Sequence, residues 1–266
     1  MKDEVNMEAI DAFRERLRSG HICLGAGITF ADPLVSDALC GSVDFLWIDL
    51  EHSPMSPEAL SGHLLAARGR NVPALVRVGG AITPLIKGAL DAGAGGIIVP
   101  QVRGVQEVRQ AVNDCRYPPL GQRGYGPRVP TGYFRDGGGE FAERANRSVF
   151  AAVMIETVEA LAALDDILAV PGLDSVVIGP SDLSFSMGVR GDVEHPRVVA
   201  AIEDIVARAR AAGKFVGAGM GPDADYAHTM ARRGVQWLQV GSDCTYLYRQ
   251  MDAIAAAFRC QWEAGR

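Results

Sequence analysis

The stretch FAAVMIE at residues 150–156 places a carboxylate at the point where an uninterrupted apolar run ends. Such a run, without polar alternation, is typical of a parallel strand that is buried on both faces. Similar short runs predict strands at 21–25, 45–48, 74–78, 96–100, 174–179, 214–218 and 237–241. Helical patterns occur at 7–19, 57–68, 83–92, 104–115, 157–168, 196–212 and 223–233. Eight strands interleaved with helices predict an α/β protein, a single (β/α)8 TIM barrel.

Length and composition agree with an ordinary globular protein. The 266 residues suit one barrel, so we expect a single domain over residues 1–266. The net charge of -6 argues against a nucleic-acid partner, because phosphate binding needs a basic face. Five cysteines without a CxxC pair, and no secretory leader, predict reduced thiols in a cytoplasmic protein. No apolar run approaches the ~18 residues of a membrane span, so no membrane partner is expected.

Residues 117–140 interrupt the alternation of strands and helices. The segment is rich in Pro, Gly and Arg, has little apolar periodicity and contains the glycine run 137–139. Loops of this length inside a compact domain are usually functional or mobile. We therefore expect a long, mobile connection after the fourth strand.

Charged side chains stand where several predicted strands end. His52 follows the second strand, Arg77 lies at the end of the third, Glu156 follows the fifth and Asp182 follows the sixth. In a parallel barrel these ends meet at one mouth, where such enzymes carry out chemistry. Carboxylates suit a hard divalent cation, an arginine can stabilise an oxyanion, and histidine suits proton transfer.

Each of these residues also has a structural interpretation when it is considered alone. Asp182 lies in a turn where a helix cap is expected, and Arg77 could form a buried ion pair. His52 could be a surface or capping histidine. The functional hypothesis therefore depends on all of these side chains meeting at one end of the barrel.

Four sequence blocks, taken together, resemble the HpcH/HpaI family of class II, metal-dependent pyruvate aldolases. They are a D-x-E-H-x-P motif at 49–54, the segments around Arg77 and 86–102, the block 116–124, and Ile155-Glu156-Thr157 with Gly-Pro-Ser-Asp-Leu-Ser at 179–184. The similarity extends from about residue 20 to 260 with the same order and spacing. It implies a lyase that cleaves a 4-hydroxy-2-oxo acid into pyruvate and an aldehyde, or forms it from them.

The resemblance also implies the role of each site residue. Glu156 and Asp182 would bind Mg²⁺, Mn²⁺ or Co²⁺, which chelates the carboxylate and keto oxygens of pyruvate and holds the enolate. Gly179 and the backbone N–H groups of Ser181 and Asp182 would contact the substrate carboxylate. Arg77 would face the keto oxygen.

Proton transfer is the remaining role that the resemblance assigns. His52, oriented by Asp91, would move the protons. No lysine is expected at the mouth, because Lys87 falls within a helix and Lys214 begins a strand at the opposite rim. This placement disfavours a Schiff-base mechanism.

The chain departs from the family pattern at three places. Met154 stands where many members carry Gln, Val78-Gly79-Gly80 follows Arg77 where Pro and Asn are frequent, and the loop 124–140 is rich in glycine. One alternative is therefore a related barrel enzyme that decarboxylates oxaloacetate or performs a citrate-type condensation. A second alternative is a non-catalytic module that binds a 2-oxo acid.

The last helix predicts a homo-oligomer. An apolar stripe on it has to be buried, either on the barrel of the same chain or elsewhere, and it consists of Leu247, Met251, Ile254, Phe258 and Trp262. The resemblance implies that this helix is exchanged between subunits of a hexamer, a trimer of dimers.

Overall fold

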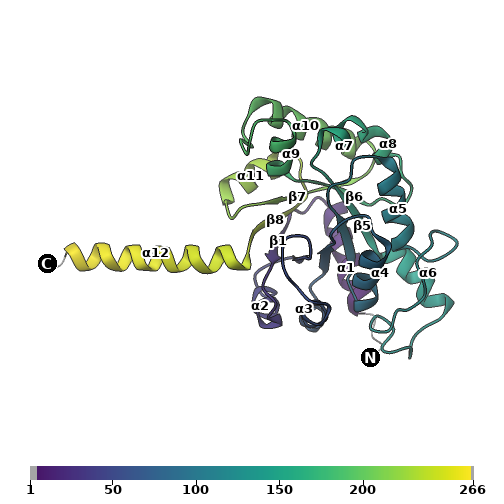
Figure 1. The fold of residues 1–266 in the computed structure, drawn as a ribbon. Helices are drawn as coiled ribbons and strands as arrows, with labels where there is room; N and C mark the ends of the chain where they lie inside the picture. The colour runs from purple at the N-terminus through teal and green to yellow at the C-terminus, as the bar shows by residue number, and fades with distance from the viewer. Residues whose placement is uncertain (1–4, 265–266) are drawn as a thin grey trace.

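The computed structural model describes residues 5–264, and its eight parallel strands close into one barrel. This confirms the predicted (β/α)8 fold, and the helices surround the strands (Figure 1). The strands are β1 (Cys23–Ile28), β2 (Phe45–Asp49), β3 (Ala74–Arg77), β4 (Gly96–Val99), β5 (Phe150–Ile155), β6 (Ser175–Ile178), β7 (Phe215–Met220) and β8 (Trp237–Ser242). The helices are α1 (Val5–Arg18), α2 (Pro33–Leu39), α3 (Pro57–Gly69), α4 (Thr83–Ala92), α5 (Val105–Cys115), α6 (Gly139–Ser148), α7 (Val158–Ala162), α8 (Leu164–Leu168), α9 (Pro180–Ser186), α10 (Pro196–Ala211), α11 (Ala224–Arg232) and α12 (Asp243–Ala264).

Three helices were not expected from the apolar pattern. The 7-residue helices α2 and α9 are too short to show a clear period, and each begins with a proline at its first position. The 10-residue helix α6 begins at Gly139, inside the segment expected to be a loop up to residue 140. The helix predicted at 157–168 is two helices, α7 and α8, which are separated at Ala163.

Large and small residues alternate between neighbouring strands inside the barrel. A Cβ atom at Gly25, Gly96 or Gly217 would overlap a side chain or the backbone of the next strand. The overlapping residues of these next strands are Phe45, Phe150 and Trp237. Gly25 and Gly217 therefore make room for an aromatic ring of the next strand, and Gly96 allows the close approach of the β5 backbone, so that the interior is filled by side chains.

Helix α1 closes the amino end of the barrel. Its apolar residues Ile10, Phe13 and Leu17 are buried and pack with the aromatic rings of the interior. The Phe13 ring lies 5.4 Å from that of Phe45 and 5.6 Å from that of Phe150. This contact leaves the carboxyl ends of the strands as the open end.

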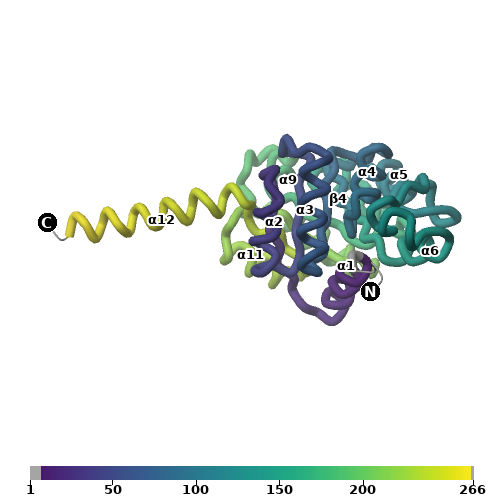
Figure 2. Tube along the Cα trace, turned by 90° about the horizontal axis from the view of Figure 1, so that it is seen from below, coloured from purple at the N-terminus to yellow at the C-terminus, as the bar shows by residue number. Residues whose placement is uncertain are grey.

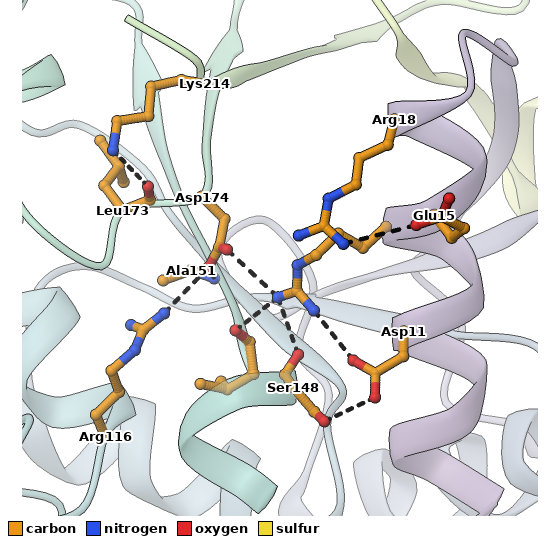
Figure 3. Close-up of polar contacts among 11 residues, drawn as sticks. Asp11, Glu15, Arg18, Arg116, Ser148, Ala151, Leu173, Asp174 and Lys214 are labelled. Atoms are coloured by element: carbon orange, nitrogen blue, oxygen red, sulfur yellow. Dashed lines mark hydrogen bonds and ion pairs between the residues drawn. The ribbon is translucent and has the colours of Figure 1, made fainter.

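A buried ion-pair cluster ties α1 to the same end of the barrel, with Asp174 at its centre (Figure 3). The Asp174 carboxylate accepts hydrogen bonds from Arg14 at 3.3 Å, from Arg116 at 3.2 Å and from the backbone N–H of Ala151 at 2.9 Å. Arg14 also donates to two backbone carbonyls, those of residues 148 and 149, at 3.0 Å. The cluster joins segments that are far apart in the sequence.

Helix α12 leaves the barrel instead of packing against it (Figures 1 and 2). Its apolar stripe is exposed, with Leu247 at 62% and Phe258 at 63% of their full accessibility. The interpretation in which the stripe packs on its own barrel is therefore wrong for this structure. Among residues 5–264, no helix is long and apolar enough to span a membrane.

Replacing Asp174 by Asn is expected to lower the free energy of unfolding by about 3 kcal/mol, because the guanidinium groups of Arg14 and Arg116 lose their shared counterion while buried. Urea denaturation measures the change. The matched control is Glu15→Gln, which removes an exposed pair with Arg18 at 3.6 Å and should cost less than about 0.5 kcal/mol. Equal losses in both variants would contradict the structural role of the cluster.

Candidate active site

The barrel brings four of the predicted site residues to the carboxyl ends of its strands. Arg77 is the last residue of β3, Glu156 follows β5 directly, and Asp182 lies in the first turn of α9 after β6. His52 lies in the loop after β2. The charges of Asp182 and Arg77 both act on the pKa of Glu156, so these groups share one electrostatic environment.

Arg77 is held by two carboxylates, one at the end of the neighbouring strand β2 and one in the loop that follows it. Its Nε and Nη2 atoms donate to the two oxygens of Asp49 at 2.9 and 2.7 Å, and its Nη1 lies 3.1 Å from Oε2 of Glu51. The guanidinium also lies over the ring of Trp47, 5.5 Å from its centre. The strand register places Asp49 directly beside Arg77, so the bidentate pair follows from strand pairing.

Asp49 also shapes the loop that carries His52. Its Oδ1 accepts the backbone N–H groups of Glu51 at 3.0 Å and of His52 at 3.4 Å. The His52 ring is 66% exposed, and its Nε2 lies 3.6 Å from Oε2 of Glu51. Burial raises the pKa of Glu51, with the charges of Asp49 and Asp182 adding to the effect and Arg77 opposing it. An accessible imidazole therefore lies at the mouth next to a partly buried carboxylate.

Glu156 is a nearly inaccessible carboxylate, 1% exposed, at the floor of the mouth. Its Oε1 accepts two hydrogen bonds from Gln101, one from the backbone N–H at 2.7 Å and one from Nε2 at 3.0 Å. Gln101 has a left-handed backbone conformation with φ of 54°, which is uncommon for a residue other than glycine. An uncommon backbone conformation therefore occurs at the residue that holds this carboxylate.

Burial raises the pKa of Glu156 to about 7. The hydrogen bond from Gln101 lowers it, the negative charges of Asp182 and Glu51 raise it further, and Arg77 lowers it again. A carboxylate that binds a proton near neutrality in the presence of other carboxylates is short of positive charge. The same site is suited to a divalent cation.

Gly179 lies against Glu156 at the start of α9. A Cβ atom at residue 179 would overlap Oε2 of Glu156 and would come within 3.2 Å of the Met154 methyl group. Ser181 and Asp182 follow in the first turn of α9, where backbone N–H groups have no partner within the helix, and both side chains are exposed. Met154 is buried under the carboxylate, so the floor of the site is apolar.

Asp91 does not meet His52 within one chain. Helix α4 runs from the carboxyl ends of the strands back toward their amino ends, and Asp91 lies in its last turn. There its Oδ1 accepts a hydrogen bond from Arg123 at 2.8 Å. The pairing of Asp91 with His52 that the resemblance implied is therefore absent from the single described chain.

Asp49 and Gln101 are the partners of Arg77 and Glu156 that our interpretation of the sequence did not assign. Asp49 was visible as the first residue of the D-x-E-H-x-P motif, but its role depends on the register between β2 and β3. Gln101 lies within the resembling segment 86–102, but the sequence did not indicate its contact with Glu156, because that contact depends on the backbone conformation after β4. Asp49 holds Arg77, and Gln101 holds Glu156.

Comparison with known proteins connects this geometry with a family of carbon–carbon lyases. The chain is 36% identical over 251 residues to a hydroxypyruvate/pyruvate aldolase of Pseudomonas aeruginosa, covering 94% of this chain and 93% of the relative. It is 36% identical to a 4-hydroxy-2-oxo-heptane-1,7-dioate aldolase of Salmonella dublin, covering 93% and 94%. Among solved structures, citrate synthase SbnG superposes with a TM-score of 0.84 at 31% identity, covering 94% and 98%.

The family model described as HpcH/HpaI aldolase/citrate lyase matches residues 30–249. This range contains the strand ends from β2 to β8 and therefore His52, Arg77, Glu156 and Asp182. The curated relatives cover almost the full chain at the same level of identity, so the agreement is not limited to a motif. The chain belongs to the HpcH/HpaI aldolase/citrate lyase family.

Proposed function

We propose that this protein is a class II aldolase, which uses a divalent cation to cleave a 4-hydroxy-2-oxo acid into pyruvate and an aldehyde, or to join them. The observation that carries the proposal is that Arg77 and the buried carboxylate of Glu156 lie at the same mouth, where the charge of Arg77 acts on the pKa of Glu156. An arginine and a cation can together stabilise the oxygen of a pyruvate enolate. The curated aldolases with 36% identity support the same reaction class.

The donor atoms at the mouth suit a hard cation. In the described range, no three His, Cys, Asp or Glu side chains are gathered into a metal cluster. Mg²⁺ and similar ions commonly use only one or two carboxylates and complete their shell with water and substrate. Glu156 and Asp182 would hold Mg²⁺, Mn²⁺ or Co²⁺, which when bound supplies a Lewis acid for the keto group of the substrate.

The side chains of the protein provide the remaining steps. In cleavage, His52 accepts the proton of the C4 hydroxyl group. The C3–C4 bond then breaks, the C4 oxygen becomes the carbonyl of the aldehyde, and the electron pair of the bond becomes the pyruvate enolate. Arg77, fixed by Asp49, faces the oxygen that becomes negative. A proton added at C3 completes pyruvate.

Binding of the substrate carboxylate would use the start of α9. The N–H groups of Ser181 and Asp182 are available there, and Gly179 leaves space beside Glu156. A Schiff-base lysine is not needed in this scheme. Lys214 lies at the amino end of β7, where its Nζ donates to the Leu173 carbonyl at 2.9 Å, and Lys87 lies on α4.

The similarity to citrate synthase SbnG favours one alternative, a barrel that takes the enolate from oxaloacetate. The two reactions differ in their first step, since oxaloacetate gives the enolate by losing CO₂ and pyruvate by losing a methyl proton. Decarboxylation of oxaloacetate without exchange of pyruvate protons would favour the alternative. Turnover of either substrate would distinguish the two enzymatic hypotheses from a non-catalytic module that only binds a 2-oxo acid.

Arg77→Lys should slow exchange of the pyruvate methyl protons in D₂O by roughly 10²-fold or more, because lysine keeps the charge but cannot form the bidentate pair with Asp49. Proton NMR with Mg²⁺, Mn²⁺ or Co²⁺, and with EDTA, measures the rate. Arg103→Lys is the control, since Arg103 is an exposed residue paired with Glu159 at 3.2 Å. Unchanged exchange in Arg77→Lys would remove Arg77 from the mechanism.

Glu156→Gln should stabilise the metal-free protein at pH 8 by up to about 3 kcal/mol. The folded-state pKa of about 7 lies above the ordinary value of 4.5, so the folded protein binds more protons in this window and its stability falls as the pH rises through it. The advantage of the Gln variant should therefore vanish near pH 4.

Urea denaturation in EDTA measures this difference, with the exposed Glu159→Gln as the control. Adding Mn²⁺ should stabilise the wild type and leave the Glu156→Gln variant almost unchanged. A Gln variant that is less stable than the wild type at pH 8, or that gains as much from Mn²⁺, would contradict the assignment of Glu156.

We also infer that the apolar stripe of α12 is covered by a second copy of this chain, because the helix leaves its own barrel. A pairing of Asp91 with His52 would likewise need a neighbouring copy. Phe258→Glu should reduce the mass found by light scattering, whereas Ala256→Glu, on the opposite face of α12, should not. The resemblance to the family implies that this assembly is a hexamer. A wild-type protein that is a monomer in solution would exclude it.

A further inference from the structure

Gln239 is a polar side chain inside the barrel. It lies on β8 two residues after Trp237, which packs with the aromatic rings of the interior. Because side chains along a strand alternate between its two faces, Gln239 also points inward, one layer closer to the carboxyl ends of the strands. The residue is partly accessible, and α1 covers the amino end of the barrel, so Gln239 is reached from the mouth.

A bulge in β8 lies directly beside this side chain. Gln239 pairs with Gly25 of β1, and the next pair is Gly27 with Ser242, so β8 has one more residue than β1 between these pairs. Gly241 lies within the bulge and has a left-handed backbone conformation with φ of 76°. Bulges are frequent next to active sites, where they re-aim a side chain.

Glycines of both neighbouring strands leave room for the amide of Gln239. A Cβ atom at Gly27 of β1 would lie 2.9 Å from Nε2, and one at Gly219 of β7 would lie 3.0 Å from Oε1. The same position at Gly219 is 3.6 Å from Cη2 of Trp47, and the guanidinium of Arg77 lies over the Trp47 ring. The amide is therefore part of the floor of the mouth, on the far side of Trp47 from β3.

The orientation of this amide is fixed, while its oxygen stays without a donor. Nε2 of Gln239 donates to the carbonyl oxygen of Gly241, so the opposite end of the amide carries the oxygen. Within the described range 5–264, no N–H or O–H group donates to Oε1 of Gln239. An amide oxygen can only accept, so a ligand that satisfies it has to bring a donor.

The proposed binding of the 2-oxo acid leaves its C3 atom facing Gln239. The keto carbon carries three groups in one plane, which are the carboxylate, the keto oxygen and C3. The proposed function directs the carboxylate to the start of α9, after β6, and the keto oxygen to Arg77, at the end of β3. In the closed barrel, β7 separates β8 from β6, and β1 and β2 separate it from β3. The side of β8 therefore remains for C3.

We propose that Gln239 is a specificity-determining residue, which selects a 2-oxo acid with a hydroxyl group on C3 as the source of the enolate. The inference rests on the proposed aldolase function. A hydroxyl on C3 would donate to Oε1, whereas the methyl group of pyruvate brings no donor and the C3 carboxylate of oxaloacetate brings only acceptors. A site built to hydrogen-bond a substrate hydroxyl rejects the analogue without it, because the polar group of the protein is then left unpaired.

The hydroxyl group stays on C3 throughout this reaction. In the forming direction, C3 gives up a proton, which passes to solvent, and the electron pair of the C–H bond becomes the enolate. C3 then attacks the carbonyl carbon of the aldehyde, and His52 gives a proton to the aldehyde oxygen. The product is a 2-oxo acid with hydroxyl groups on C3 and on C4.

Gln239→Leu tests this role, because leucine fills similar space without an acceptor. Exchange of the C3 protons of hydroxypyruvate in D₂O, followed by NMR with Mg²⁺, should lose about 10-fold or more in kcat/KM, while exchange of the pyruvate methyl protons should change less than about threefold. Gln106→Leu is the control, since Gln106 is an exposed glutamine on α5, and it should alter neither rate.

A purely structural role of Gln239 predicts a different result. Gln239 also holds the bulge through Gly241, and loss of that support alone would weaken both acids equally. Isothermal titration calorimetry with hydroxypyruvate and with pyruvate separates the two roles. An equal loss of affinity for both acids in Gln239→Leu, or no loss for hydroxypyruvate, would overturn the inference.

Gly219→Ala decides if Gln239→Leu does not fold. The added methyl group would crowd Oε1 of Gln239, so the preference for hydroxypyruvate over pyruvate should fall by about threefold or more. An unchanged preference in this variant would remove Gln239 from substrate selection.

The wild-type protein distinguishes failure of this inference from failure of the proposed function. It should exchange the C3 protons of hydroxypyruvate with a kcat/KM about 10-fold or more above that for pyruvate. Exchange that is at least as efficient with pyruvate would overturn only the selection by Gln239. Exchange with neither acid, with Mg²⁺, Mn²⁺ or Co²⁺, would overturn the proposed function itself.

Discussion

The guanidinium of Arg77 has to balance several carboxylates at one rim of the barrel. Barrel closure brings Asp49, Glu51, Glu156 and Asp182 to the same mouth, because each follows or ends a parallel strand or begins the next helix. Arg77 forms ion pairs with Asp49 and Glu51. The remaining negative charge is neutralised either by a proton on Glu156 or by a bound cation. The proposed chemistry depends on the cation replacing this proton.

The fold could be predicted because its strands are buried on both faces. Runs such as 150–155 are apolar throughout, and the strand bounds differ from the expected ones by only a few residues. The pattern of apolar residues did not predict the short helices. α2 and α9 have few turns, and their only local signals are a proline at the first position and, for α2, the cap Asp32.

Within the candidate site, the sequence could predict only those residues that stand at the ends of strands. Arg77, Glu156 and Asp182 follow from where hydrophobic runs stop, whereas Gln101 depends on one backbone conformation that no pattern announces. Asp91 shows the opposite limit. Within one chain α4 runs away from the mouth, so Asp91 in its last turn lies at the other rim and accepts a hydrogen bond from Arg123. An Asp91 beside His52 would have to come from a neighbouring copy, which the sequence of one chain does not place. Direction along the helix decides which rim a residue can reach.

The floor of the mouth explains why Glu156 is so sensitive to its surroundings. Gln101 donates two hydrogen bonds to Oε1, while Oε2 lies against Gly179, which also lies close to the buried methyl group of Met154. A thioether cannot donate a hydrogen bond, so it leaves the ionised carboxylate without support from below. Positive charge must therefore arrive from the open side, where Asp182 lies and where substrate enters. Met154 thus makes the carboxylate depend on what the mouth binds.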